Sequence, residues 1–124
     1  RFARPIRWIL AAFNAEKVEF EIEGVVSGTE SRGHRFYAPE TFEALTLGDL
    51  IAGLRARQVE PDADVRKRMI LEQTAAVAGG SAETPAALLD ENTYLTEWPT
   101  AIVGEFPTSY LELPEPVLVT AMAK

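Results

Sequence analysis

The chain has 124 residues, the length of one ordinary domain. Its 47% hydrophobic and 25% charged residues are typical of a globular protein and exclude disorder. The 12 basic and 19 acidic side chains give a net charge of −7, which argues against nonspecific nucleic-acid binding by the whole surface. The absence of cysteine excludes disulfides and zinc–thiolate sites and fits a reducing compartment. No apolar run reaches the roughly 20 residues that span a bilayer, so no membrane association is expected.

The first elements in chain order are a helix and two strands. Apolar residues recur at helical spacing and predict a helix over residues 6–13, which the pair 14–15 then breaks. Residues 17–23 alternate strictly between apolar side chains and carboxylates or lysine, the pattern of a half-buried strand. Residues 35–37 are expected to form a second short strand.

The second half of the chain is mainly helical. Thr46 predicts a helix cap, and Asp49 stands at the capping-box position three residues later. The elements expected after that helix are a short strand at 58–60, a helix from 61–62 to 79–80, a helix over 85–94, a buried strand at 100–104 and a helix after Pro114 and Pro116. Strands and helices alternate without a βαβ rhythm, so we expect a single mixed α+β domain with an antiparallel or mixed sheet and flanking helices.

Basic residues gather in two short runs, at 1–8 and 31–36. These runs contain five of the 12 basic side chains, namely Arg1, Arg4, Arg7, Arg32 and Arg35. From residue 69 to residue 123 there is no lysine or arginine. Any anion-binding surface is therefore expected in the first half of the chain.

The run at 31–36 supports two interpretations. Guanidinium groups of Arg32 and Arg35 suit phosphate geometry, Gly33 would allow close backbone approach, and His34 could stack on or donate to RNA. Alternatively, the arginines pair with the carboxylates of strand 17–23 and His34 is a turn histidine with satisfied hydrogen bonds. The residues alone leave both interpretations open.

The run at 1–8 supports a similar pair of interpretations. Arg4 and Arg7 are three residues apart and would share one face of the predicted helix. That face could meet a phosphate backbone, or it could form salt bridges to neighbouring domains. Trp8 and Trp98 are expected to be core or interface anchors.

No catalytic pattern is present in the sequence. A Ser-His-Asp triad would depend on His34, the single histidine, and no nucleophile elbow, phosphate loop or dinucleotide fingerprint occurs. One histidine without cysteine makes a transition-metal site an unfavourable interpretation. We therefore expect no catalytic, cofactor-binding or metal-binding residue in this chain.

Five motifs follow one another along the chain. They are Arg1-Phe2-x-Arg4-Pro5-Ile6-Arg7-Trp8-Ile9-Leu10, Gly24-x-x-Ser27-Gly28 leading into Ser31-Arg32-Gly33-His34-Arg35-Phe36, Leu95-Thr96-Glu97-Trp98-Pro99 leading into Ala101-Ile102-Val103-Gly104-Glu105-Phe106, Tyr110-Leu111-Glu112-Leu113-Pro114-Glu115, and Val117-Leu118-Val119-Thr120-Ala121-Met122. In this order they resemble one family, the beta subunit of bacterial-type glycyl-tRNA synthetase. The family usually has threonine at position 31, and residues 79–85 depart most from its pattern. The resemblance runs from end to end, and residues 1–124 are expected to be one internal domain of a longer beta subunit.

The resemblance implies a part in a cytoplasmic class II ligase of two alpha and two beta subunits. That enzyme joins glycine to its tRNA with ATP and magnesium, and its glycine and ATP sites lie on the alpha subunit. The fold is expected to be similar to the central editing-type module of the phenylalanyl-tRNA synthetase beta chain, an analogy at the level of fold. The present chain would be non-catalytic and contribute to tRNA recognition and holoenzyme assembly.

Three functional hypotheses follow. In the first, Arg4, Arg7, Arg32, His34 and Arg35 contact glycine tRNA, mainly at its backbone. In the second, the chain is a purely structural assembly module whose arginines make interdomain contacts with no RNA. In the third, a pocket around His34 retains an editing hydrolysis, for which a negative deacylase assay is expected.

Overall fold

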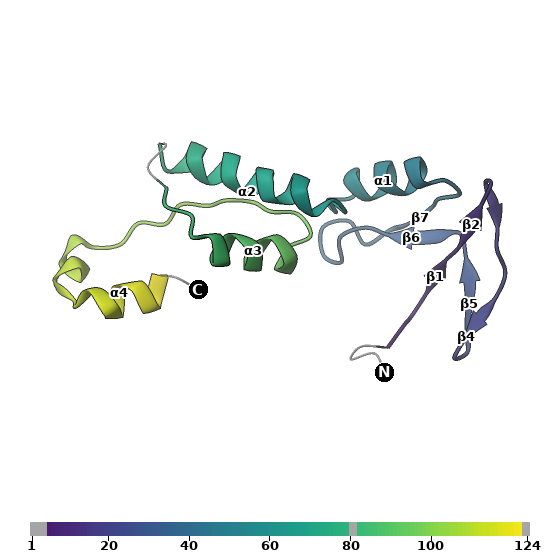
Figure 1. The fold of residues 1–124 in the computed structure, drawn as a ribbon, viewed down its shortest axis with the longest axis horizontal. Helices are drawn as coiled ribbons and strands as arrows, with labels where there is room; N and C mark the ends of the chain where they lie inside the picture. Colours follow the sequence, from purple (N-terminus) through teal and green to yellow (C-terminus); the bar gives the residue numbers. More distant parts are fainter. Residues whose placement is uncertain (1–4, 80–81, 123–124) are drawn as a thin grey trace. The chain divides into compact units, whose positions relative to one another are not determined.

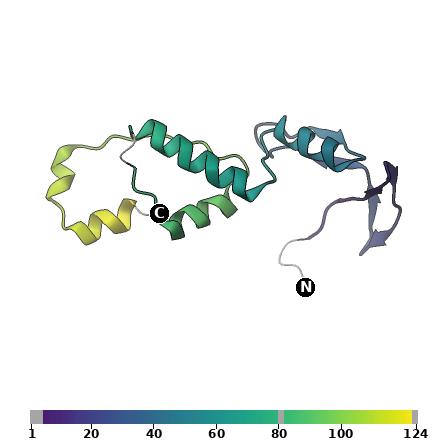
Figure 2. The ribbon, with the colours of Figure 1, turned by 45° about the horizontal axis from the view of Figure 1, so that its top comes forward.

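The computed structural model describes residues 5–79 and 82–122, and within it the chain divides into two compact units, Arg1–Pro61 and Asp62–Lys124. Figures 1 and 2 show short strands in the first unit and helices in both, so the predicted α+β class is confirmed. Each unit is described by itself. That residues 1–124 act as one internal domain stays a prediction.

The first unit begins with paired short strands. They are β1 (Ile9–Leu10), β2 (Ala12–Phe13), β3 (Glu16–Lys17), β4 (Glu21–Ile22) and β5 (Val25–Gly28). β5 is the centre of a sheet of order β1-β5-β4, in which β1 runs parallel and β4 antiparallel to it. β2 and β3 form a separate antiparallel hairpin.

The helix predicted over residues 6–13 is wrong, because the chain turns back on itself immediately afterwards. Asn14 and Ala15 have φ values of 50° and 62°, as a two-residue type I′ hairpin turn requires. Glu23 and Gly24, at 50° and 82°, make a second such turn between β4 and β5. These hairpins give the preceding apolar residues strand partners, which fix an extended conformation.

The strand predicted over 17–23 is confirmed only near its two ends, in β3 and β4. The prediction that its apolar side chains are buried on one face is wrong. Val18, Phe20 and Ile22, which we call the apolar row, are 41%, 40% and 44% exposed. Between β3 and β4 the backbone is bound by Ser27, itself 2% exposed. The Ser27 hydroxyl accepts the N–H of Phe20 at 2.9 Å and donates to the carbonyl of Val18 at 2.7 Å.

A third hairpin and the first helix complete this unit. β6 (Glu30–Arg32) pairs antiparallel with β7 (Thr41–Glu43), and α1 (Leu47–Arg55) packs on β7. The capping box predicted at Thr46 is confirmed, because the Thr46 hydroxyl accepts the Asp49 N–H and the Asp49 carboxylate accepts the Thr46 N–H, both at 3.1 Å. Residues 35–37, expected as a strand, form turns within the β6–β7 loop.

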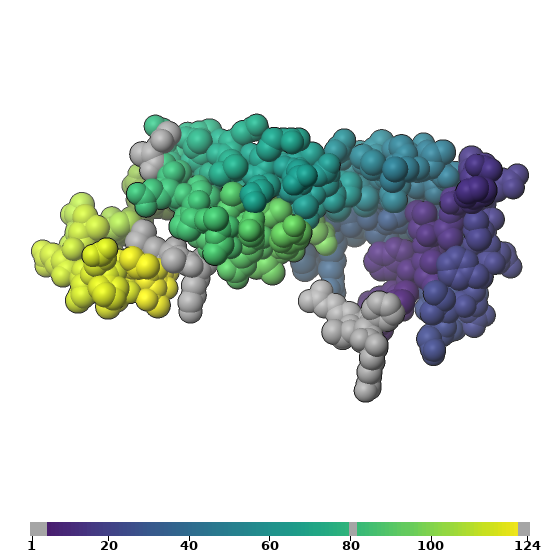
Figure 3. Space-filling view, viewed as in Figure 1, coloured from purple at the N-terminus to yellow at the C-terminus, as the bar shows by residue number. Residues whose placement is uncertain are grey.

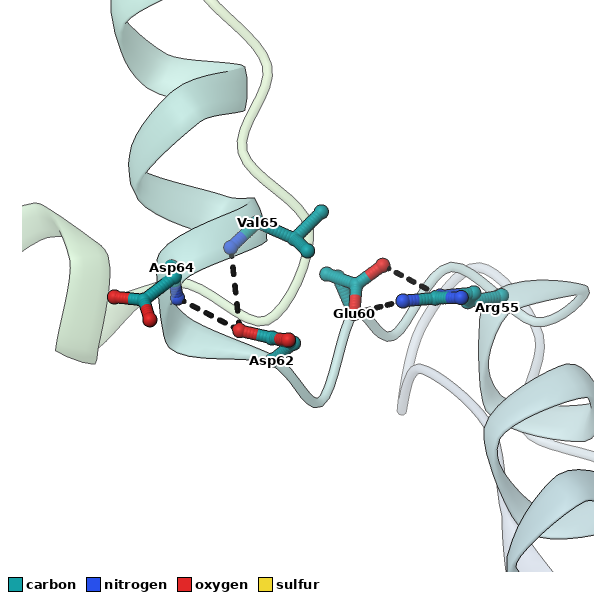
Figure 4. Close-up of polar contacts among 5 residues, drawn as sticks. All are labelled: Arg55, Glu60, Asp62, Asp64 and Val65. Carbon is teal, nitrogen blue, oxygen red and sulfur yellow. Dashed lines mark hydrogen bonds and ion pairs between the residues drawn. The ribbon is translucent and has the colours of Figure 1, made fainter.

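The strand expected at 58–60 is wrong, because α1 ends there in a left-handed turn with Gln58 at φ 58°. Glu60 is 4% exposed, and Arg55 at the end of α1 binds it with two hydrogen bonds of 2.7 and 3.0 Å (Figure 4). This ion pair connects the last turn of the helix to the segment that follows it.

The helices of the second unit follow the sequence predictions closely. They are α2 (Ala63–Val77), α3 (Ala86–Leu95), a 3₁₀ turn η1 (Thr108–Glu112) and α4 (Glu115–Met122). Asp62 caps α2 by accepting the N–H groups of Asp64 and Val65 at 2.9 and 3.3 Å (Figure 4), and Gly79 follows its end at φ 61°. Pro116, expected ahead of the last helix, lies within its first turn.

α2 and α3 lie side by side (Figures 1 and 3). Lys67 and Asp90 join them at 2.6 Å, and Arg66 donates to the carbonyl of Thr93 at 2.9 Å. The strand predicted at 100–104 is wrong. The backbone at residues 99–101 is bound instead by the side chain of Gln73 on α2, which donates to the Pro99 carbonyl at 3.2 Å and accepts the N–H of Ala101 at 2.9 Å.

The hydrophobic core is small in both units. Among the described residues, the buried hydrophobic side chains are Ala44 and Leu89, at 1% and 7% exposed. Many large apolar side chains are instead exposed to solvent, so both units have extensive apolar surface that their own folding does not bury.

Candidate nucleic-acid interface

The β6–β7 loop, residues 33–40, is organised around His34. Its Nδ1 atom accepts the backbone N–H groups of Phe36 at 3.2 Å and Tyr37 at 3.3 Å, and its carbonyl accepts the N–H of Ala38 at 3.0 Å. Because Nδ1 is an acceptor, the neutral ring carries its proton on Nε2. His34 is half-buried and is the turn histidine of the second interpretation.

Gly33 is required by packing inside the unit. A Cβ at this position would lie 2.3 Å from the carbonyl oxygen of Ala38 and 2.4 Å from Cβ of Arg57. The space beside this glycine is therefore filled by Ala38 and by Arg57, which follows the end of α1. The geometry does not support a phosphate in the same place.

Arg57 anchors the loop, a role that the sequence did not reveal. Its carbonyl accepts the N–H of His34 at 2.9 Å. Its guanidinium lies 4.7 Å from the ring centroid of Phe42 and donates to the carbonyl of Gly53 at 3.3 Å. These partners come from β7, α1 and the loop, so no local spacing could have indicated them.

Arg32, the last residue of β6, and Arg35, in the loop, are exposed and lie beside aromatic rings. Arg32 lies 5.3 Å from the ring centroid of Trp8, and Arg35 lies 5.7 Å from that of Phe36. Within the described part of the chain, neither guanidinium has a carboxylate at ion-pair distance. The pairing with strand 17–23 is thus absent there, and the Glu19 carboxylate binds Lys17 at 3.1 Å instead.

The remaining predicted contact residues lie in or next to the run at 1–8. Arg7 is exposed in an irregular segment before β1, so the shared helical face with Arg4 is wrong. Arg4 itself lies outside the described residues. Trp8 is 49% exposed and not a core anchor, but its contact with Arg32 brings the two basic runs together.

We call Arg32, His34, Arg35, Phe36 and Tyr37 the hairpin-loop surface. Phe36 and Tyr37 are 79% and 76% exposed, and the ring of His34 lies 4.6 Å from that of Tyr37 at an interplanar angle of 33°. The surface offers guanidinium groups that can bind phosphates and exposed ring faces that can stack with bases.

No cluster of three or more potential metal ligands occurs over residues 5–79 and 82–122. None of the helices in those ranges has the length and apolar character needed to cross a membrane.

Comparison with known proteins identifies the family. The sequence model described as glycyl-tRNA synthetase beta subunit matches residues 1–124. The chain is 42% identical to the glycine–tRNA ligase beta subunit of Clostridioides difficile (strain 630) and 46% identical to that of Syntrophus aciditrophicus (strain SB). Each match covers 98% of this chain and 18% of the relative, so the chain spans about a fifth of the length of these curated relatives. The resemblance carried by the five motifs is thereby confirmed, and the chain belongs to the glycyl-tRNA synthetase beta subunit family.

Proposed function

We propose that this chain is a non-catalytic part of a glycine–tRNA ligase beta subunit and that its hairpin-loop surface contacts tRNA during glycyl-tRNA synthesis. Family membership supports the overall reaction, since the relatives carry the name glycine–tRNA ligase beta subunit. One observation carries the tRNA contact: Arg32, at the end of β6, and Arg35, in the loop that follows, are exposed and, within the described residues, lack carboxylate partners.

The rest of the proposal concerns the holoenzyme and comes from the family resemblance. The ligase is a cytoplasmic class II enzyme with two alpha and two beta subunits, and ATP with magnesium is used on the alpha subunit. We assign no catalytic, ATP-binding or metal-binding residue to this chain. Likeness of its fold to the central editing-type module of the phenylalanyl enzyme's beta chain belongs to the same proposal, without an editing activity.

Electrostatics explain why the contact would be local. The chain carries a net charge of −7, so its average field repels a polyanion. Screening limits that repulsion to about 8–10 Å at physiological salt, whereas a guanidinium in contact with a phosphate acts at hydrogen-bond distance. Exposed arginines without carboxylate partners, as Arg32 and Arg35 are within the described residues, can therefore bind RNA backbone on an acidic chain.

The test is the salt dependence of tRNA binding by the holoenzyme. Arg32→Gln combined with Arg35→Gln should weaken binding of glycine tRNA and reduce the slope of log K against log salt by about one for each arginine that contacts a phosphate. Arg68→Gln, at an exposed position on α2, is the matched control and should leave the slope unchanged. An unchanged slope in the double variant would show that the loop does not contact tRNA.

A structural role in assembly is the second candidate, and a different observation favours it. The apolar row is exposed along residues 18–22, from the end of β3 through β4, and it alternates in sequence with the carboxylates of Glu19, Glu21 and Glu23. Such a surface suits protein rather than RNA. Phe20→Ala should then shift the holoenzyme toward smaller species in sizing with light scattering. If the oligomer is unchanged in that variant, the row has no part in assembly.

A further inference from the structure

We infer that the hairpin-loop surface takes unpaired nucleotides of the tRNA, with a base stacked on Phe36 or Tyr37 and the flanking phosphates on Arg32 and Arg35. The inference rests on the proposed function, because it presumes that this surface contacts tRNA. It adds which part of the RNA is bound and which side chains recognise it.

Exposure of the two rings is the first observation. Phe36 and Tyr37, at 79% and 76%, are the most exposed of the phenylalanine, tyrosine and tryptophan side chains in the described residues. They are adjacent in sequence and lie at the tip of the β6–β7 loop. Leaving two large rings in water has no benefit for the fold of this unit, so their placement calls for a ligand with flat apolar faces.

Rigidity of the loop is the second observation. The His34 ring accepts the backbone N–H groups of both aromatic residues, and the Arg57 carbonyl holds His34 in place at 2.9 Å. His34 also lies against one side of the Tyr37 ring at 4.6 Å. The backbone that presents the rings is therefore ordered before a ligand arrives, which reduces the entropy lost on binding.

Combination of rings with cations is the third observation. Each arginine of the hairpin-loop surface lies within 6 Å of an aromatic ring: Arg35 is 5.7 Å from the ring centroid of Phe36, and Arg32 is 5.3 Å from that of Trp8. In a duplex the faces of the bases are already stacked on one another. A duplex would therefore contact the arginines through its phosphates without stacking a base on Phe36 or Tyr37. An unpaired nucleotide uses both, since its base stacks and its phosphate pairs with a guanidinium.

The experiment compares ring and charge variants in the holoenzyme, with a glycine tRNA transcript as the probe. Phe36→Ala combined with Tyr37→Ala should weaken binding about fivefold to a hundredfold without changing the salt slope. Phe36→Trp combined with Tyr37→Phe should restore it. Phe13→Ala, which removes a ring that is 71% exposed on the β2–β3 hairpin, is the matched control and should bind normally.

Cross-linking identifies the nucleotide that the loop contacts. The photoreactive amino acid p-benzoylphenylalanine at position 36 should cross-link to a base in a loop or an unpaired end of the tRNA. A cross-link confined to paired nucleotides would overturn the inference.

The variants separate failure of the inference from failure of the proposed function. If the ring variants bind normally while the arginine variants bind weakly, the loop contacts only backbone and the inference is wrong. If neither set weakens binding, the proposed tRNA contact is itself wrong. If the ring variants lose subunit assembly with tRNA affinity intact, the loop is a protein contact and the inference is overturned.

Discussion

Gly33→Ala tests whether the close packing of the β6–β7 loop on α1 holds the site together. Alanine can adopt the backbone conformation at this position, since Gly33 is not in the positive-φ region. The obstacle is space. The added Cβ would lie 2.3 Å from the Ala38 carbonyl oxygen and 2.4 Å from Arg57 Cβ, whereas ordinary contact begins at 3.4 Å. Both neighbours are fixed close to the backbone, so the loop has to move by about an ångström.

The expected cost follows from three contributions. Overpacking of this kind costs about 1–3 kcal/mol. Separation of the loop from Arg57 would also lose the 2.9 Å hydrogen bond from His34, worth about 0.5–1.5 kcal/mol. The lower entropy of unfolded alanine returns about 0.4–1 kcal/mol. The net destabilisation is therefore about 0.5–4 kcal/mol, centred on about 2 kcal/mol, for the local opening of the loop.

Hydrogen exchange on the beta subunit measures this opening directly. At about 1.4 kcal/mol for each factor of ten, the central cost of about 2 kcal/mol should lower protection of the His34 amide about 30-fold. Gly48→Ala is the control, because its Cβ would meet nothing closer than 3.7 Å and alanine favours the α1 helix in which it lies. Full protection in Gly33→Ala would refute the packing account of the loop.

Three further predictions concern the supports of the two units. Ser27→Ala should speed amide exchange in the β4–β5 hairpin by an amount that corresponds to about 1–3 kcal/mol, because it leaves a donor and an acceptor unsatisfied; normal exchange would contradict this. Hydrogen bonds from the Thr46 side chain and backbone hold the pKa of Asp49 below its usual value. The stability that these bonds give the folded state is therefore fully present above the unfolded-state pKa of Asp49, and it is lost as the pH falls through the folded-state pKa. Thr46→Ala should raise the Asp49 pKa in an NMR titration and destabilise α1 at neutral pH by a margin that shrinks in acid to the loss of the cap bond from the Asp49 N–H; an unmoved titration would count against the capping box. Gln73→Ala should free residues 99–101 and speed exchange of the Ala101 amide, and retained protection of that amide would mean that another contact holds the segment.

Helix ends could be predicted because they depend on neighbours in sequence. The capping box of α1 and the turn after α2 at Gly79 each require side chains or dihedral angles within a few residues. The helix expected over 6–13 failed for the opposite reason. Eight residues of helical apolar spacing are compatible with paired strands, and the choice is made by β5, which follows more than a dozen residues later.

The candidate site was predictable to the same extent. Arg32, His34 and Arg35 are close in sequence, so their clustering needed no tertiary information. The role of His34 as the hydrogen-bonding centre of the loop was left open between two interpretations, because it depends on which ring nitrogen faces the backbone. Arg57 could not be found at all, since the contacts that define it come from three separate elements.

Two exposed apolar surfaces of the first unit differ in their charged neighbours, and ionic strength should separate their roles. The apolar row alternates in sequence with carboxylates, which repel a polyanion, whereas the rings of the hairpin-loop surface lie beside guanidiniums, which attract one. A change in the apolar row, Phe20→Ala, should therefore alter subunit assembly to the same degree at low and high salt. Arg35→Gln should weaken tRNA binding strongly at low salt and less as counterions replace its contribution. If Phe20→Ala weakened tRNA binding with the same salt dependence as Arg35→Gln, the two surfaces would form one RNA interface, and the separation by charge would be wrong.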